Sequence, residues 1–137
     1  MKKICCLLIL LASLGCGLLR AEKVSGFTTS KNGNSGFITF KVEAIDYRPD
    51  LIRVYGSLVG RPHTAERIDN LVLVTADGKQ YVATDIEGVD FKRWFQWEDD
   101  GSIAVEIDFP PMKALKGFTL KSSGPKGESC SKISKCR

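Results

Sequence analysis

The sequence predicts a single small all-β domain, an antiparallel β-sandwich of about seven strands, with a small β-barrel as the alternative. Three observations lead to this fold class. Short apolar segments recur at roughly ten-residue spacing. Glycine, proline, asparagine and aspartate separate these segments as turn residues. The mature chain carries no long helical pattern, and only residues 112–116 could form a helical turn.

Alternation of apolar and polar residues defines the early strands, because every second side chain of a strand faces the core. In the first strand Ile38, Phe40 and Val42 point one way, and Ile52 and Val54 repeat the pattern in the second. The third is nearly all apolar, as expected of a strand covered on both faces. An Asp-Gly hairpin turn joins it to the fourth. The expected strands are residues 37–45, 51–59, 68–76, 80–84, 91–97, 103–109 and 117–122.

The later strands rest on equally local signals. The fifth is rich in aromatic residues and is followed by a hairpin turn at residues 98–101. The sixth shows the clearest alternation in the chain, from Ile103 to Phe109, and a proline pair stops it. The seventh directs Phe118 and Leu120 toward the core.

The first twenty-one residues have the layout of a secretory signal peptide. Lys2 and Lys3 precede an apolar run of about eleven residues, which is too short for the ~20 that cross a bilayer. Cleavage after Ala21 or Gly17 would release a periplasmic or secreted protein. Lipid attachment at Cys16 would instead give an outer-surface lipoprotein, the one route to membrane association that we expect. The expected organisation is a signal peptide at 1–21, a β-sandwich domain at 22–123 and a basic C-terminal tail at 124–137.

Charge is unevenly distributed along the mature chain. The net charge of +4 falls to near +1 once the three basic residues of the signal peptide are removed. Residues 22–112 hold 10 basic and 15 acidic side chains, whereas residues 113–137 hold 7 and 1. A net charge near zero argues against nucleic acid as a partner. The basic end is expected to be a solvated tail, or a segment held on an acidic cell-surface polymer or membrane.

Two cysteines, Cys130 and Cys136, remain after removal of the signal peptide and of Cys16. In an oxidising compartment an even pair usually bonds. We expect a disulfide that closes a small loop and contributes about 2 kcal/mol. Free or partner-bonded thiols are the alternative. The spacing is not that of a thioredoxin-like site, and no histidine lies nearby, so a redox or metal role is not expected.

A longer pattern runs through residues 36–122. A strand ending in Val54-Tyr55-Gly56 is followed by an apolar strand, the turn segment 76–81 and a variable acidic segment. The strand 103–109, two prolines and a closing Phe118-Thr119-Leu120 complete it. This order resembles the small secreted immunoglobulin-like domains of bacterial surface and periplasmic proteins. The resemblance implies an immunoglobulin-like sandwich, and a role in binding or packing because such domains share no enzymatic site.

The segment Phe91–Trp97 is the most unusual local sequence. In a strand, Lys92, Trp94 and Gln96 share one face, while the remaining aromatic residues lie on the other. An outward Trp94 between Lys92 and Gln96 suits a sugar ring or a protein partner. The alternative is that both faces of the strand are covered, or that Trp94 packs on a loop. The acidic residues on both sides of the segment disfavour stacking on nucleic-acid bases.

The loop between the second and third strands is rich in hydrogen-bond donors. Arg61, His63 and Arg67 could contact an anionic or sugar ligand, although an ion pair of Arg67 with Asp69 or Glu66 would explain part of the pattern without one. His63 is the only histidine, and it could act as a general base if Glu66 or Asp69 oriented it. No nucleophile motif accompanies it. We therefore expect no catalytic residue and no cofactor.

The acidic segment after the fourth strand is a candidate for calcium binding. Asp85, Glu87 and Asp90 could supply three oxygen ligands. Their spacing does not match the EF-hand loop, and loops at strand ends are often acidic, so we expect no metal site.

Together these observations predict an exported protein that is not an enzyme but a binding or interaction module of the periplasm or cell surface. Its ligand would be a protein or a glycan. The recognition face would combine Trp94 and its neighbours with the loop Arg61–Arg67. The alternatives are a secreted hydrolase inhibitor and a structural envelope subunit.

Overall fold

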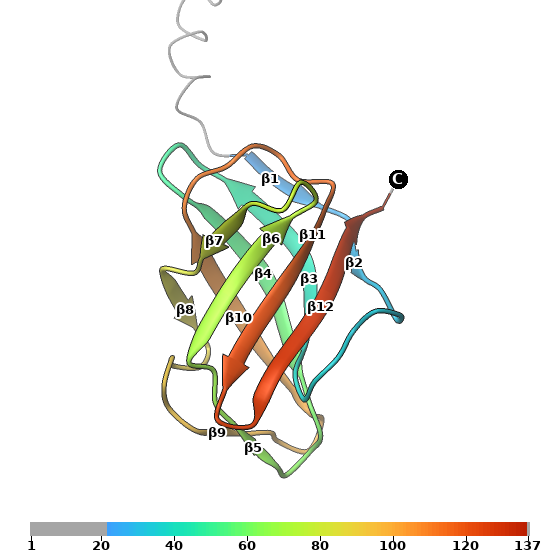
Figure 1. The fold of residues 1–137 in the computed structure, drawn as a ribbon, viewed down its shortest axis with the longest axis vertical. Helices are drawn as coiled ribbons and strands as arrows, with labels where there is room; N and C mark the ends of the chain where they lie inside the picture. Colours follow the sequence, from blue (N-terminus) through green and yellow to red (C-terminus); the bar gives the residue numbers. More distant parts are fainter. Residues whose placement is uncertain (1–21, 137) are drawn as a thin grey trace, which may run out of the picture.

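The protein is an all-β sandwich of two antiparallel five-stranded sheets, as the sequence predicts, although it has twelve strands rather than about seven (Figure 1). The computed structural model describes residues 22–136. The predicted signal peptide at 1–21, with the candidate lipid site Cys16, lies outside the described residues. Within residues 22–136, no helix is long and apolar enough to cross a membrane.

Each large sheet combines strands from both halves of the chain. The first has the order β1 (Glu22–Ser25), β3 (Thr39–Tyr47), β4 (Ile52–Val59), β10 (Ser102–Phe109) and β8 (Asp85–Glu87). The second has the order β2 (Phe27–Thr29), β12 (Gly127–Lys135), β11 (Gly117–Gly124), β6 (Asn70–Thr75) and β7 (Gln80–Val82). A separate two-stranded sheet pairs β5 (Ala65–Glu66) with β9 (Phe95–Gln96) at one end of the sandwich (Figure 1).

Six of the seven expected strands are present close to their expected bounds. The exception is residues 91–97, of which only β9 is a strand. The helical turn expected at 112–116 is absent. The short strands β1, β2, β5 and β8 were not expected, because two to four residues show too little alternation to stand out. β1, β2 and β8 each pair with a longer strand, whereas β5 pairs with the equally short β9.

The structure corrects the prediction of a basic tail at 124–137. Residues Gly127–Lys135 form β12, which pairs with β11 on one side and β2 on the other. Its inward positions are Ser129, Ser131 and Ile133, all buried. Two of these three side chains are polar, so the apolar alternation that marks a half-buried strand is missing from the sequence. The sandwich therefore extends nearly to the C-terminus.

The predicted disulfide between Cys130 and Cys136 is absent from the structure, and both thiols are free. Cys130 lies within β12, and Cys136 follows the strand directly, with its N–H donating to the carbonyl of Gly26 at 2.6 Å. Six residues of extended chain span about 20 Å, whereas disulfide-linked Cα atoms lie within ~7 Å of each other. The ladder that forms β12 therefore keeps the two thiols apart.

The two large sheets bury a single apolar core between them. Its members come from alternating positions of the central strands, which confirms the inward faces assigned to the first, second, sixth and seventh expected strands. The largest fully buried side chains are Trp97, Phe40, Phe109, Ile45, Ile52, Leu58, Ile68, Leu71, Leu73, Ile107, Leu120 and Ile133.

Serine hydroxyls join the two sheets where β3 passes β12. The Ser131 Oγ accepts a hydrogen bond from the Phe40 N–H at 2.9 Å. The Ser129 Oγ accepts from the N–H groups of Phe37 and Ile38 at 2.9 and 3.1 Å. These hydroxyls replace the neighbouring strand that this part of β3 lacks, since buried backbone N–H groups need partners.

Candidate functional site

Two segments that the sequence marked separately are paired in the structure. Ala65 lies opposite Gln96, and Glu66 lies opposite Phe95, in the sheet of β5 and β9. The His63 N–H donates to the Trp97 carbonyl at 3.1 Å and so continues the pairing beyond β5. The donor-rich loop and the aromatic segment therefore form one surface, although about thirty residues separate them in the chain.

Side-chain alternation divides this small sheet into a buried and an exposed face. Trp97 is 1% exposed, and Glu66 is also buried. Phe95 meets the Trp97 ring edge-on, with centroids 5.2 Å apart. Ala65 and Gln96 point to the other face, and the remaining predicted contact residues flank the pairing along the chain: Arg61, His63, Lys92 and Trp94 are exposed, and Arg67 is half-buried. We call these six residues and Ala65 the end face.

Trp97 anchors the small sheet to the sandwich. The indole ring lies against Gly60, where an added Cβ would come within 2.1 Å of the ring. The Trp97 N–H donates to the Thr64 carbonyl at 3.0 Å. Its indole Nε1 is buried without a hydrogen-bond partner in the structure, so packing rather than polar contact holds the ring.

Trp94 is the main exposed aromatic residue of the end face, at 52% exposure. The Arg67 guanidinium lies over the indole, 5.8 Å from the ring centroid, which is cation–π distance. Asp69 fixes the guanidinium by two hydrogen bonds, from Nε at 2.7 Å and from an Nη at 3.1 Å. These hydrogen bonds lower the pKa of Asp69 and raise that of Arg67. Arg67 is therefore held in place beside the indole.

Backbone strain also concentrates on the end face. Among residues 22–136, His63 and Lys92 are the only non-glycine residues with left-handed φ, at 66° and 63°. Such conformations are uncommon outside glycine and cost of order 1–3 kcal/mol, and they cluster at functional sites. The Lys92 N–H donates to the Ile68 carbonyl at 2.8 Å. This bond holds the turn that presents Trp94.

His63 is not oriented by either of the two residues predicted for it, Glu66 and Asp69. Its Nε2 lies 3.0 Å from the Asp99 Oδ1, and both side chains are largely exposed. Neither of the predicted orienting residues contacts it. Glu66 is buried near the Lys126 amine at 3.5 Å, and Asp69 is bonded to Arg67. The arrangement is a contact between two exposed side chains at the surface.

The turn between β11 and β12 supports the small sheet from the side. The Lys126 Nζ donates to the Ala65 carbonyl at 2.7 Å. The Asp69 N–H donates to the Ser123 carbonyl at 2.8 Å. Three separate connections of the chain therefore meet at this end of the sandwich, where Figure 1 shows β5 and β9 beside the β11–β12 turn.

The candidate calcium ligands do not form a metal site. Asp85 and Glu87 lie on β8 and are exposed, and Asp90 lies in the following turn. Across residues 22–136, no three histidine, cysteine or carboxylate side chains are grouped so that they could hold a metal ion. β8 is extended because it pairs with β10, so its residues cannot curl around an ion.

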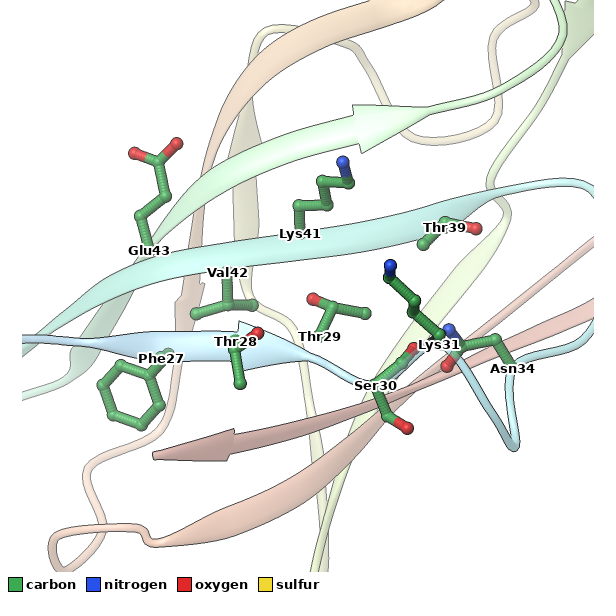
Figure 2. A pocket seen from close by; sticks show the side chains of 10 residues that line it. All are labelled: Phe27, Thr28, Thr29, Ser30, Lys31, Asn34, Thr39, Lys41, Val42 and Glu43. Atoms are coloured by element: carbon green, nitrogen blue, oxygen red, sulfur yellow. Dashed lines mark hydrogen bonds between the residues drawn. The ribbon is translucent and has the colours of Figure 1, made fainter. Parts of the chain in front are cut away.

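The structure contains a groove of about 460 Å³ that the sequence did not predict (Figure 2). It lies where β2 and β3 face each other across the open side of the sandwich. Its lining combines two apolar side chains with hydroxyl, amide and charged groups: Phe27, Thr28, Thr29, Ser30, Lys31, Asn34, Thr39, Lys41, Val42 and Glu43. No motif marks this set, because its two halves belong to different sheets and meet only when the sheets pack.

Comparisons of the chain with protein-family models, curated proteins and solved structures found no match. The end face and the groove are therefore the two features of the molecule that bear on its function.

Proposed function

We propose that this protein is an exported, non-enzymatic binding module that contacts a protein or glycan partner through the end face. The observation that carries the proposal is the pairing of β5 with β9, which joins the two segments that hold the six predicted contact residues, five of them exposed. The six residues come from two segments that are distant in the chain, and exposure alone would not bring those segments together.

An immunoglobulin-like topology supports the proposal. The first sheet contains β3-β4-β10-β8 and the second contains β12-β11-β6-β7. Lettering these strands A to G in chain order, with β7 as C′, gives A-B-E-D against G-F-C-C′, the arrangement of immunoglobulin-like sandwiches. The strands β1 and β2 are then additions at the A and G edges.

The position of the end face in this topology supports a recognition role. β5 lies in the connection between β4 and β6, which corresponds to the B–C loop, and Lys126 lies in the F–G turn. In immunoglobulin variable domains, these loops belong to the end of the sandwich that contacts antigen. The correspondence is one of topology, and the contact chemistry comes from this chain's own residues.

That chemistry matches the residues that dominate binding energy at interfaces. Tryptophan and arginine are enriched among such residues, and an arginine that is already immobilised loses less entropy on binding. Asp69 immobilises Arg67 beside Trp94 by two hydrogen bonds. Gln96 and His63 add exposed hydrogen-bonding groups to the end face.

A Trp94→Ala variant tests the proposal. The exported protein is immobilised and exposed to cell-exterior extract and to a glycan array, beside wild type and Phe37→Ala. Phe37 is a matched control because it is 59% exposed and lies outside the end face. We expect Trp94→Ala to lose binding at least tenfold, a loss of about 1.4 kcal/mol, and Phe37→Ala to retain it.

Two outcomes would contradict the proposal. A folded Trp94→Ala variant that keeps the full affinity of wild type would remove Trp94 from the interface. Equal losses in Trp94→Ala and Phe37→Ala would show that exposed aromatic residues act without regard to position. Urea unfolding of all three proteins confirms that each is folded before binding is compared.

A further inference from the structure

The groove between β2 and β3 exists because the chain changes sheets at Gly26. β1 pairs with β3 as far as the pair Ser25 and Ala44. The chain then turns at Gly26, whose φ of +89° favours glycine, and β2 pairs with β12 in the other sheet. From Thr39 to Glu43, β3 therefore faces β2 across a gap and makes no backbone hydrogen bonds to it.

The walls of the groove are fixed. Phe27 and Val42 are buried and form its apolar side. The Thr29 hydroxyl donates to the Phe40 carbonyl at 2.7 Å and ties the two strands together. The Asn34 Oδ1 accepts from the Lys132 N–H at 3.0 Å and holds the loop at one end. The volume of about 460 Å³ lies within the range of small-ligand sites.

Other polar side chains on the rim are uncommitted. Within residues 22–136, Lys31, Lys41 and Glu43 make no ion pair, and the hydroxyls of Thr28 and Thr39 make no hydrogen bond. Figure 2 shows the amines of Lys31 and Lys41 on the same side of the groove, with the Glu43 carboxylate toward the opposite end. The groove thus offers two cations at one end, an acceptor at the other, and hydroxyls and an apolar wall between them.

We propose that this groove binds an acidic saccharide. A sugar carboxylate would pair with the amines of Lys31 and Lys41, and sugar hydroxyls would donate to Glu43. Five residues of β3 span about 16 Å, which accommodates a chain of a few sugar units. A fatty acid would make no use of Glu43, and a neutral sugar would make no use of the charge on either amine.

The test is an NMR titration of the exported protein with tri-galacturonic acid, beside neutral maltotriose and a triglutamate peptide. We expect tri-galacturonic acid to shift the backbone amide signals of Thr28, Thr39 and Val42, and the other two probes to leave them unchanged. The double variant Lys31→Gln, Lys41→Gln should bind the trisaccharide at least tenfold more weakly.

Matched controls separate this site from general charge and from the end face. Lys79→Gln, Lys113→Gln removes the same charge outside the groove, and Trp94→Ala alters only the end face, so both should retain wild-type affinity for the trisaccharide. An unshifted groove, or equal losses in the two lysine double variants, would overturn the proposal. Equal binding of triglutamate in the groove would overturn the saccharide assignment and identify an acidic-peptide site.

Discussion

Replacing Ser131 with alanine tests whether side-chain hydroxyls close the edge of the first sheet. The Ser131 side chain is 0% exposed, and its Oγ accepts from the Phe40 N–H at 2.9 Å. Phe40 is itself only 2% exposed, so water cannot replace the lost acceptor without opening the core. The substitution therefore leaves a buried backbone N–H unpaired.

The expected loss follows from that orphaned donor. Leaving a buried donor unsatisfied costs about 1–3 kcal/mol, so we expect the free energy of unfolding to fall by about 2 kcal/mol. With a urea m-value of about 1.5 kcal/mol/M for a domain of this size, the midpoint should fall by about 1.3 M. The removal of a single oxygen creates little cavity, so packing loss contributes a minor part.

The assay is urea unfolding followed by tryptophan fluorescence, in which buried Trp97 reports the loss of the core. Ser134→Ala is the control because Ser134 lies on the same strand with its side chain exposed. The control should stay within about 0.5 kcal/mol of wild type. A Ser131→Ala variant as stable as Ser134→Ala would refute the idea that this hydroxyl substitutes for a neighbouring strand.

Three further predictions concern the end face and the first sheet. Gly60→Ala should destabilise the protein by about 1–3 kcal/mol in urea unfolding, because its Cβ would lie 2.1 Å from the Trp97 ring; an unchanged midpoint would contradict that packing. Burial raises the pKa of Tyr47, whose hydroxyl accepts a backbone N–H from the β10–β11 connection at 2.9 Å. The stability that this shift contributes is full below the ordinary pKa of 10.0 and is lost as pH rises through the folded-state pKa, so Tyr47→Phe should abolish that alkaline loss. The pKa of Asp69 is lowered, so the NMR chemical shift of the Arg67 Nε–H should hold as pH falls past 3.8 and move only at lower pH, whereas in Asp69→Asn it should show no such acid titration.

Local alternation was enough to predict the main strands. Residues 103–109 alternate strictly and form β10 within one residue of the expected bounds. The Asp77-Gly78 pair predicted a hairpin, and the structure has one between β6 and β7, with Gly78 at a φ of +90°. Both signals depend only on neighbours in the chain, so tertiary contacts were not needed to find them.

Strands could not be predicted from the sequence where polar side chains face inward or where a short strand depends on its partner. The sequence of β12 predicts a tail because Ser129 and Ser131 occupy core positions, so the strand lacks alternating apolar residues. The predicted cysteine bridge failed with it, since a tail can bend to join Cys130 to Cys136 and a paired strand cannot. β8 was read as an acidic turn because its extended form depends on β10.

The sequence by itself determined the class of fold, because hydrophobic alternation is a local property that decides which side of a strand meets the core. Only the tertiary structure decided which distant segments of the chain become neighbours. It paired β5 with β9 and so united Trp94 with Arg67, and it separated β2 from β3 and so opened the groove. Such proximities depend on hydrogen bonds between segments distant along the chain, and the choice of partner is a property of the whole sandwich.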